Sequence, residues 1–312
     1  NPLLVRGATQ LLGTMGLPST LERGATKSFS EALLDLRLER EMGSHLKPGW
    51  NIHPRDKLSP EQRLAASNVV FLAMTQPPAL PKGEEPYPYP LQPGSDAWNY
   101  AEVEERLRSV EIPKSWRDRA TSWQLFLSAT THPYFSVIGA GSSSIACGYQ
   151  ASRKETVSIL SEVDTSPDFG TNVLRWLCSI DLKKMAASNC SDATEPNEPC
   201  WMHYEIVCHM AGLDAALETL DLTSRQKLFK LAVWDAEYFL SQGENLLANG
   251  PVRLMYIIYK KPENFRGSFP PGLTLPALSA QQTWFMDQQL PGSASLQSVA
   301  SAKTQLGLTQ RP

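Results

Sequence analysis

The sequence predicts a mainly α-helical protein, with one irregular body of several helices, extended proline-rich arms and at most a small β element. Three observations lead to this prediction. Helix-start signals, in which Ser or Thr is followed three residues later by Glu or Gln, recur along the chain. Apolar residues then repeat at three- and four-residue spacing, as on one face of a helix. Dense prolines separate some of these segments and block regular structure there.

The overall composition allows a large core and disfavours several classes of protein. The chain has 312 residues, of which 42% are hydrophobic, and a formal net charge of −3. A protein that neutralises many phosphates normally carries a clear basic excess, so non-specific duplex binding is not expected, although a local basic groove stays open. The longest apolar run, residues 69–74, is far shorter than a membrane span needs. We therefore expect no membrane span, and we expect this run to lie in the core.

The cysteines predict reduced thiols rather than a disulfide or zinc framework. Their number is odd, and no two of them form a CxxC pair. We therefore expect an intracellular, cytoplasmic protein with no cofactor and no bound metal. The five cysteines are Cys147, Cys178, Cys190, Cys200 and Cys208.

The first elements follow from helix caps and breakers. Residues 1–25 are expected to form an N-terminal arm, because glycines and a proline interrupt each of its short apolar runs. A helix is expected over 26–43. Its start is a capping box, in which the Ser28 hydroxyl accepts from a backbone N–H and Glu31 reaches back, and Gly43 is a natural stop.

Prolines set the second helix and the segment after it. Ser59-Pro60-Glu61-Gln62 starts a helix expected over 59–74, with Pro60 at the first helical position, where its missing N–H costs nothing. Residues 77–93 then hold seven prolines in seventeen positions, which predicts an extended strap over 77–98. Three roles stay open for this strap: a crossover between two helical layers, an arm that reaches another subunit, or a peptide that a proline-binding domain recognises.

A helix with two tryptophans is expected next, over 113–131. Trp116 and Trp123 belong to an apolar stripe that repeats at i, i+4, i+7 and i+11, the spacing of a core-facing helix. A short strand is expected at 134–138. The glycines that follow lack the spacing of a phosphate-binding loop, so we expect a turn of small residues there.

The rest of the body is expected to be helical, and it gives way to a second arm. Residues 251–259 are too few to decide between a strand and a buried helix. The body spans 26–261, and residues 262–312 form an irregular, proline-rich C-terminal arm whose last twenty residues are expected to be flexible unless a partner holds them. The helices expected in this part of the body are 153–163, 171–187, 200–211, 213–220 and 223–241.

The chemically densest stretch, residues 200–212, is the candidate catalytic or metal site. On a helix, Glu205 and His209 share one face because they are four residues apart. Such a couple can form half of a metal site in a helix bundle, and Asp235 and Glu237 are the best donors for the other half. We prefer the interpretation of a core helix with a satisfied histidine. An acid–base or metal couple, and redox use of the neighbouring cysteines, stay open.

For function, we expect a structural, self-assembling protein: a viral coat or nucleocapsid-type subunit, or a helical subunit of a large complex. The arms cannot build a core of their own, yet they keep large apolar residues that need burial, so we expect contacts with copies of the chain or with other subunits. The alternative is a helical enzyme that uses Glu205 and His209. The candidate interface residues are Tyr87, Tyr89, Trp98, Phe265, Phe269, Trp284 and Phe285.

Nucleic acid is a weaker candidate partner, because each basic cluster is more simply explained as a solvated helix face. Pairs of basic residues nevertheless recur along the body and would be the phosphate contacts of a packaging protein. The candidates are Arg117, Arg119, Arg153, Lys154, Lys183, Lys184, Lys260 and Lys261.

Overall fold

The computed structural model shows a mainly α-helical protein. It describes residues 58–75, 80–92, 95–135, 145–155, 157–187, 201–260 and 296–312. Every regular element in these ranges is a helix and none is a strand, which confirms the predicted fold class for this part of the chain. The N-terminal arm, the helix expected over 26–43 and most of the C-terminal arm lie outside the described residues.

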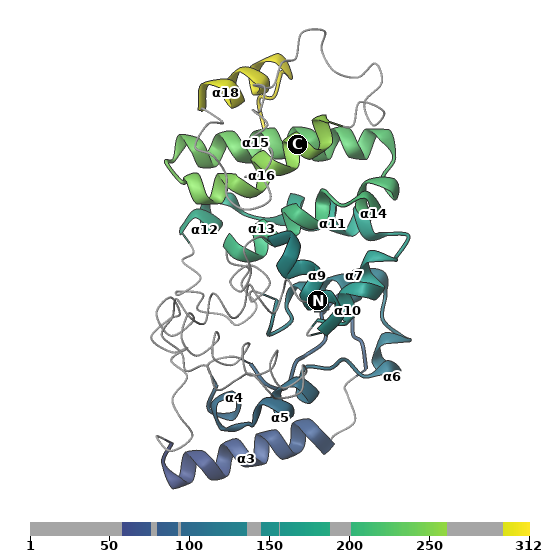
Figure 1. Ribbon diagram of the computed structural model, residues 1–312, viewed down its shortest axis with the longest axis vertical. Helices are drawn as coiled ribbons and strands as arrows, with labels where there is room; N and C mark the ends of the chain where they lie inside the picture. Colours follow the sequence, from purple (N-terminus) through teal and green to yellow (C-terminus); the bar gives the residue numbers. More distant parts are fainter. Residues whose placement is uncertain are drawn as a thin grey trace, which may run out of the picture.

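The helices follow one another along the long axis of the molecule, from α3 at one end to α15, α16 and α18 at the other (Figure 1). In chain order they are α3 (Pro60–Thr75), α4 (Asp96–Tyr100), α5 (Val103–Ser109), α6 (Lys114–Arg117), α7 (Ser122–Thr130), α9 (Ile145–Glu155), α10 (Ile159–Asp164), α11 (Phe169–Ser179), α12 (Leu182–Ala187), α13 (Trp201–Ala211), α14 (Asp214–Glu218), α15 (Leu222–Ser241), α16 (Asn245–Tyr259) and α18 (Leu296–Gln305).

Two of the predicted helices are each divided into a pair. The helix expected over 113–131 is α6 followed by α7, and that expected over 171–187 is α11 followed by α12. Polar side chains cap the second helix of each pair. The Thr121 hydroxyl accepts from the Gln124 amide at 3.2 Å, and Asp181 accepts from the amide two residues later at 2.9 Å. The preceding helices end before these caps: α6 ends at Arg117, and α11 ends at Ser179, before Ile180, which has an extended backbone conformation.

The predictions around residues 134–163 are wrong in two places. The described part of the expected strand, Tyr134 and Phe135, is a buried turn after α7, closed by a 2.8 Å bond from the Phe135 amide to the His132 carbonyl. The helix expected over 153–163 is replaced by two helices, α9, which already begins at Ile145, and α10, whereas most of the expected small-residue turn lies outside the described residues.

The upper part of the molecule is built around α15. This helix packs along α16 on one side and is covered by α18 on another, while α13 lies against α16 (Figure 1). The undecided residues 251–259 are therefore part of a buried helix. Pro251 sits inside α16 and cannot donate to the carbonyl of Leu247, so the helix goes on with one hydrogen bond fewer.

The described part of the strap, residues 80–92, runs from the side of α3 to α7. The amide of Tyr87 donates to the Ser128 hydroxyl at 2.7 Å, and the Tyr89 hydroxyl donates to the Ser128 carbonyl at 2.7 Å. Tyr87 also meets the Trp116 ring edge-on, with 5.4 Å between ring centroids. Hydrogen bonds and ring contacts within the chain thus hold the strap.

A buried carboxylate joins the C-terminal segment to the helical body. Asp235 of α15 is 1% exposed. The Arg311 guanidinium donates two hydrogen bonds to it, both of 2.8 Å, and the Tyr204 hydroxyl donates a third, of 2.7 Å. Arg311 also donates to the backbone carbonyls of Leu177 and Ile180 at the end of α11, at 2.8 and 2.7 Å. The expectation of a flexible C-terminal end is therefore wrong for residues 296–312.

Burial and the pairing with Arg311 shift the pKa of Asp235 in opposite directions. Burial raises the pKa of Asp235, and the hydrogen bonds and charge of Arg311 work against that rise. The arginine is thus the group that allows an ionised carboxylate inside the core.

Replacing Arg311 with Met should leave Asp235 buried without a counter-charge and lower the free energy of unfolding by about 3–5 kcal/mol. Adding Asp235→Asn to this variant should restore part of the loss. Lys114→Ala, which removes a surface pair with Asp118, should cost less than about 1 kcal/mol and is the control. Urea unfolding followed by circular dichroism measures all of these, and equal losses for Arg311→Met and Lys114→Ala would contradict the assignment.

Candidate functional site

Glu205 and His209 lie four residues apart on α13, as the sequence predicted. His209 is buried, and its ring meets the Tyr149 ring edge-on, with 5.4 Å between the ring centroids. Its Nε2 atom has no hydrogen-bond partner among the described residues. On the other side α16 approaches closely, since a Cβ built on Gly250 would lie 3.3 Å from the Glu205 Cα atom. His209 is thus enclosed by neighbouring elements, whereas Glu205 is half-buried beside α16.

Burial changes the proton affinities of both groups toward their neutral forms. It raises the pKa of Glu205 to about 7, against the opposing charge of Arg253. It lowers the pKa of His209 to about 4, and Arg253 lowers it further in the same direction. At neutral pH the histidine is uncharged and the carboxyl group is close to half-protonated, which is the state that general acid–base chemistry uses.

The second half of a metal site is not present where the sequence placed it. Asp235 is bound by Arg311 and Tyr204, and Glu237 pairs with Lys303 at 2.9 Å. Over the described ranges, no three His, Cys, Asp or Glu side chains are grouped so that they could hold a metal ion. Within those ranges, Glu205 and His209 therefore stand as an isolated couple.

Glu205→Gln should make the protein more stable at high pH. Because the folded state raises the pKa of Glu205 from 4.5 to about 7, wild-type stability falls as the pH rises between these values. The gain of the variant should be up to about 3 kcal/mol at pH 8 and under about 1 kcal/mol at pH 5. Thermal unfolding at both pH values measures this gain in stability. Glu218→Gln, at an exposed site, is the control. A gain that does not depend on pH would contradict the burial of the Glu205 carboxyl group.

A different histidine should make the fold sensitive to acid. Burial lowers the pKa of His132 to about 3, and a hydrogen bond with the Val110 backbone opposes this shift. Nδ1 of His132 accepts from the Tyr134 amide at 3.1 Å, so that atom has no proton in the fold. The unfolded chain binds a proton near pH 6.5.

Stability should therefore fall as the pH drops from about 6.5 toward 3. His132→Asn keeps an acceptor for the Tyr134 amide but does not titrate in this range. Its unfolding midpoint should change less between pH 7 and pH 5 than that of the wild type. Denaturant titrations at the two pH values compare the chains, and an equal drop in both would rule out a role for His132.

The predicted interface residues that the structure describes are not available at the surface. Tyr87, Tyr89 and Trp98 are 7%, 6% and 1% exposed, and they pack in the core of their own chain. The prediction that they bind another subunit is corrected by this burial. The reason is that the strap is paired with α7, so its rings fill space between helical layers. The other candidates, Phe265, Phe269, Trp284 and Phe285, lie outside the described residues.

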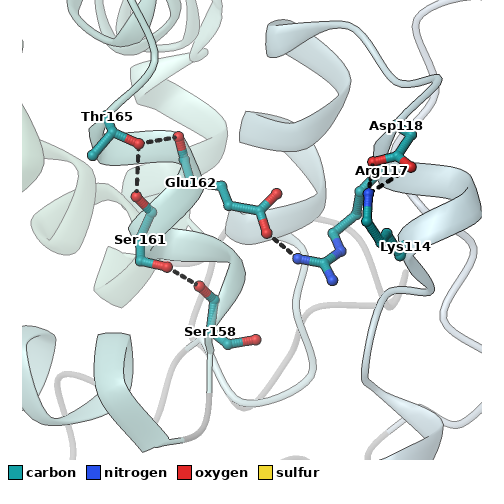
Figure 2. Close-up of polar contacts among 7 residues, drawn as sticks. All are labelled: Lys114, Arg117, Asp118, Ser158, Ser161, Glu162 and Thr165. Carbon is teal, nitrogen blue, oxygen red and sulfur yellow. Dashed lines mark hydrogen bonds and ion pairs between the residues drawn. The ribbon is translucent and has the colours of Figure 1, made fainter.

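The predicted basic residues do not form one continuous patch in the described part of the chain. Arg117 is bound by Glu162 of α10, as Figure 2 shows, and Arg153 pairs with the buried Asp164 at 2.9 Å. These two charges are therefore already neutralised by carboxylates of the same chain. Lys183 and Lys184 are exposed side by side on α12, and Arg119 and Lys260 are exposed after α6 and α16, whereas the side chain of Lys154 and the whole of Lys261 lie outside the described residues.

The most unusual surface of the described chain lies on α3. One side of this helix packs against α4 and α5, and the opposite side faces away from the body at the end of the molecule (Figure 1). Five of the seven exposed large apolar side chains in the described ranges belong to this one helix. Leu64 and Phe71 are the most exposed, at 65% each. The α3 surface consists of Leu64, Val69, Phe71, Leu72 and Met74.

An open apolar hollow of about 310 Å³ adjoins this surface. Val69 and Ala65 of α3 line it on one side, and Pro90 of the strap and Ala97 of α4 line it on the other. The α3 surface thus continues into a recess between the helix and the strap. Exposed apolar areas of this kind mark protein or ligand contacts more often than ordinary solvent-facing surface.

This surface was not predicted from the sequence, because the run 69–74 was expected to lie in the core. Val70 and Ala66 are buried, but Val69, Phe71, Leu72 and Met74 are exposed, so the prediction is wrong for most of the run. A signal was present: from Leu64 to Thr75 no residue is charged on any side of the helix. A helix that is apolar all round needs cover on all sides.

The comparisons with known proteins add no relative. No protein-family model, no curated protein and no solved structure matches this chain. Among the helices that the structure describes, none combines the length and the apolar character needed to cross a bilayer. The candidate site therefore rests on the geometry of the chain itself.

Proposed function

We propose that this chain is a structural subunit that acts by burying the α3 surface against another protein chain. The carrying observation is the group of exposed apolar side chains on a helix whose last twelve residues hold no charge. Depletion of charge with large apolar residues is typical of the centre of protein interfaces. Whether the assembly is a viral coat, a nucleocapsid or another large complex stays a prediction.

The size of the surface supports such a contact. The exposed parts of its five side chains amount to an area on the order of 500 Å². At roughly 25 cal/mol per Å², burying this area on one chain contributes roughly 12 kcal/mol before the costs of association, which are of similar size. The α3 surface can therefore support a contact of moderate strength, and further segments would strengthen it.

This proposal changes the location of the expected contact. The strap was expected to provide aromatic residues to a neighbour, but its tyrosines are used inside the chain. The run 69–74 of α3, expected inside the core, provides apolar residues at the surface instead. The role of a self-assembling subunit is retained, and the residues that would perform it are different.

The enzyme alternative keeps one supporting observation. Glu205, with its pKa raised to about 7, stands on the same face of α13 as a neutral His209 whose Nε2 atom lacks a hydrogen-bond partner among the described residues. We rank it second, because the couple lies between α16 and Tyr149, whereas the α3 surface is open to solvent.

Phe71→Glu should break the assembly while leaving the fold intact, because Phe71 is exposed and makes little of the core. Size-exclusion chromatography with light scattering over a range of concentrations should show wild-type chains in a species larger than a monomer. The variant should need at least roughly tenfold higher concentration to reach the same state. Circular dichroism should be the same for both chains.

The matched control is Leu222→Glu. Leu222 is also an exposed apolar residue, 45% exposed, but it begins α15 at the other end of the molecule (Figure 1). This variant should assemble like the wild type. If the wild-type chain forms no larger species alone, the wild type and Phe71→Glu are each used to pull down partners from an extract of the native source. Equal capture of every partner by both chains would overturn the proposal.

A further inference from the structure

We infer that the chain that covers the α3 surface is a second copy of the same chain, with two α3 helices packed antiparallel about a two-fold axis near Asn68. This inference rests on the proposed function, because it names the partner of the same surface. The supporting observations are the placement of the exposed side chains along α3, the absence of charge between them and the amount of area.

The exposed apolar residues occupy both halves of α3: by the helix repeat, Leu64, Phe71 and Leu72 lie on the face opposite to the buried residues, and Val69 and Met74 lie on its two flanks. Leu64 and Phe71 are seven residues apart, close to two full turns, so their side chains point in nearly the same direction. Asn68 lies between them on this face and is exposed, and Thr75 follows one turn after Phe71. The face opposite to the buried Ala66 and Val70 is therefore an uncharged strip from Leu64 to Thr75, with Asn68 near its centre and Thr75 at its C-terminal end.

The distribution of bulk along this strip favours an antiparallel partner. The N-terminal half has one large apolar side chain, Leu64, whereas the C-terminal half has Phe71, Leu72 and Met74. An axis near Asn68 places Leu64 of each chain at the level of Leu72 of the other, so each bulky half meets a half with free space. A parallel pair would set bulky half against bulky half.

Charge points to the same arrangement. The only charged residues of α3 are Glu61 and Arg63 in its first turn, so two strips meet without repulsion between like charges. In the antiparallel pair, the positive N-terminal end of each helix dipole lies beside the negative C-terminal end of the other. In a parallel pair, equal ends would lie side by side.

The area is consistent with a dimer that exchanges with monomers. The side chains of the α3 surface offer on the order of 500 Å² per chain, against about 800 Å² per partner in a standard stable interface. Because a two-fold contact uses the same surface on both chains, the two copies cover both surfaces and leave no unpaired edge that would continue into a filament. We therefore expect dimers that appear at micromolar concentration and separate on dilution.

The test uses single cysteines on the exposed face and a short thiol crosslinker. Asn68→Cys places a thiol beside the axis, so the two copies should be joined efficiently. Glu61→Cys places the thiols near opposite ends of the pair, about 20 Å apart along the helices by the 1.5 Å rise per residue, and should not crosslink. The wild-type chain, with its five cysteines, measures the background. Both positions are exposed, so neither variant should fail to fold.

Each outcome decides between the possible partners. Crosslinking at position 68 but not at 61, lost when Phe71→Glu is added, confirms the antiparallel pair. Equal crosslinking at both positions overturns the arrangement in favour of a parallel pair. If Phe71→Glu abolishes assembly or partner capture but position 68 never crosslinks, this inference fails while the proposed function stands. If the wild-type chain is a monomer and a cysteine at position 71 is protected from maleimide, a segment of the chain itself covers α3, and both proposals fail.

Discussion

The upper half of the structure depends on one constraint: an aspartate carboxylate placed in the core must be neutralised and hydrogen-bonded. Asp235 of α15 meets this condition with partners from two other parts of the chain, namely Tyr204 of α13 and Arg311 near the end of the sequence. Arg311 in turn donates to the carbonyls of Leu177 and Ile180 at the end of α11. One charge pair thus fixes the relative positions of four segments, and it does so with directional bonds that apolar packing alone would not provide.

The lower half is organised differently, by aromatic packing around the strap. Tyr87, Tyr89 and Trp98 fill space between α3, α7 and the helices beside them, and Ser128 ties the strap to α7 through its hydroxyl and its carbonyl. Prolines keep this segment extended, so it can cross between layers without unmet strand hydrogen bonds. Helix α3 packs on this part with small residues, Ala66 and Val70, which leaves its larger residues outside. Its exposed face is therefore remote from the Asp235 centre, and a change there can alter assembly without loosening the core.

The Glu205–His209 couple illustrates how a chemical signal in a sequence can have a structural origin. Both side chains share a face of α13, but that face is packed between Tyr149 and α16, and burial pushes each group toward its neutral form. A shifted pKa is the expected result of an enclosed site as much as of a catalytic one. A second pair of ligands or a substrate recess beside the couple would distinguish a catalytic site from a merely enclosed one. Asp235 and Glu237 form neither, because each has an ion-pair partner of its own.

The sequence by itself determined the helical class and the start of α3 at Ser59 and Pro60, because caps, prolines and apolar periodicity act on neighbouring residues. It also placed Glu205 and His209 on one helical face, since that follows from the helix repeat alone. Only the tertiary structure decided which apolar residues are covered. The run 69–74 and the tyrosines of the strap have the same apolar character in the sequence. In the structure the run is mostly exposed and the tyrosines are buried. The difference arises because burial depends on which distant segments pack on each side. The pairing of Asp235 with Arg311, across most of the C-terminal quarter of the chain, was beyond any local pattern for the same reason.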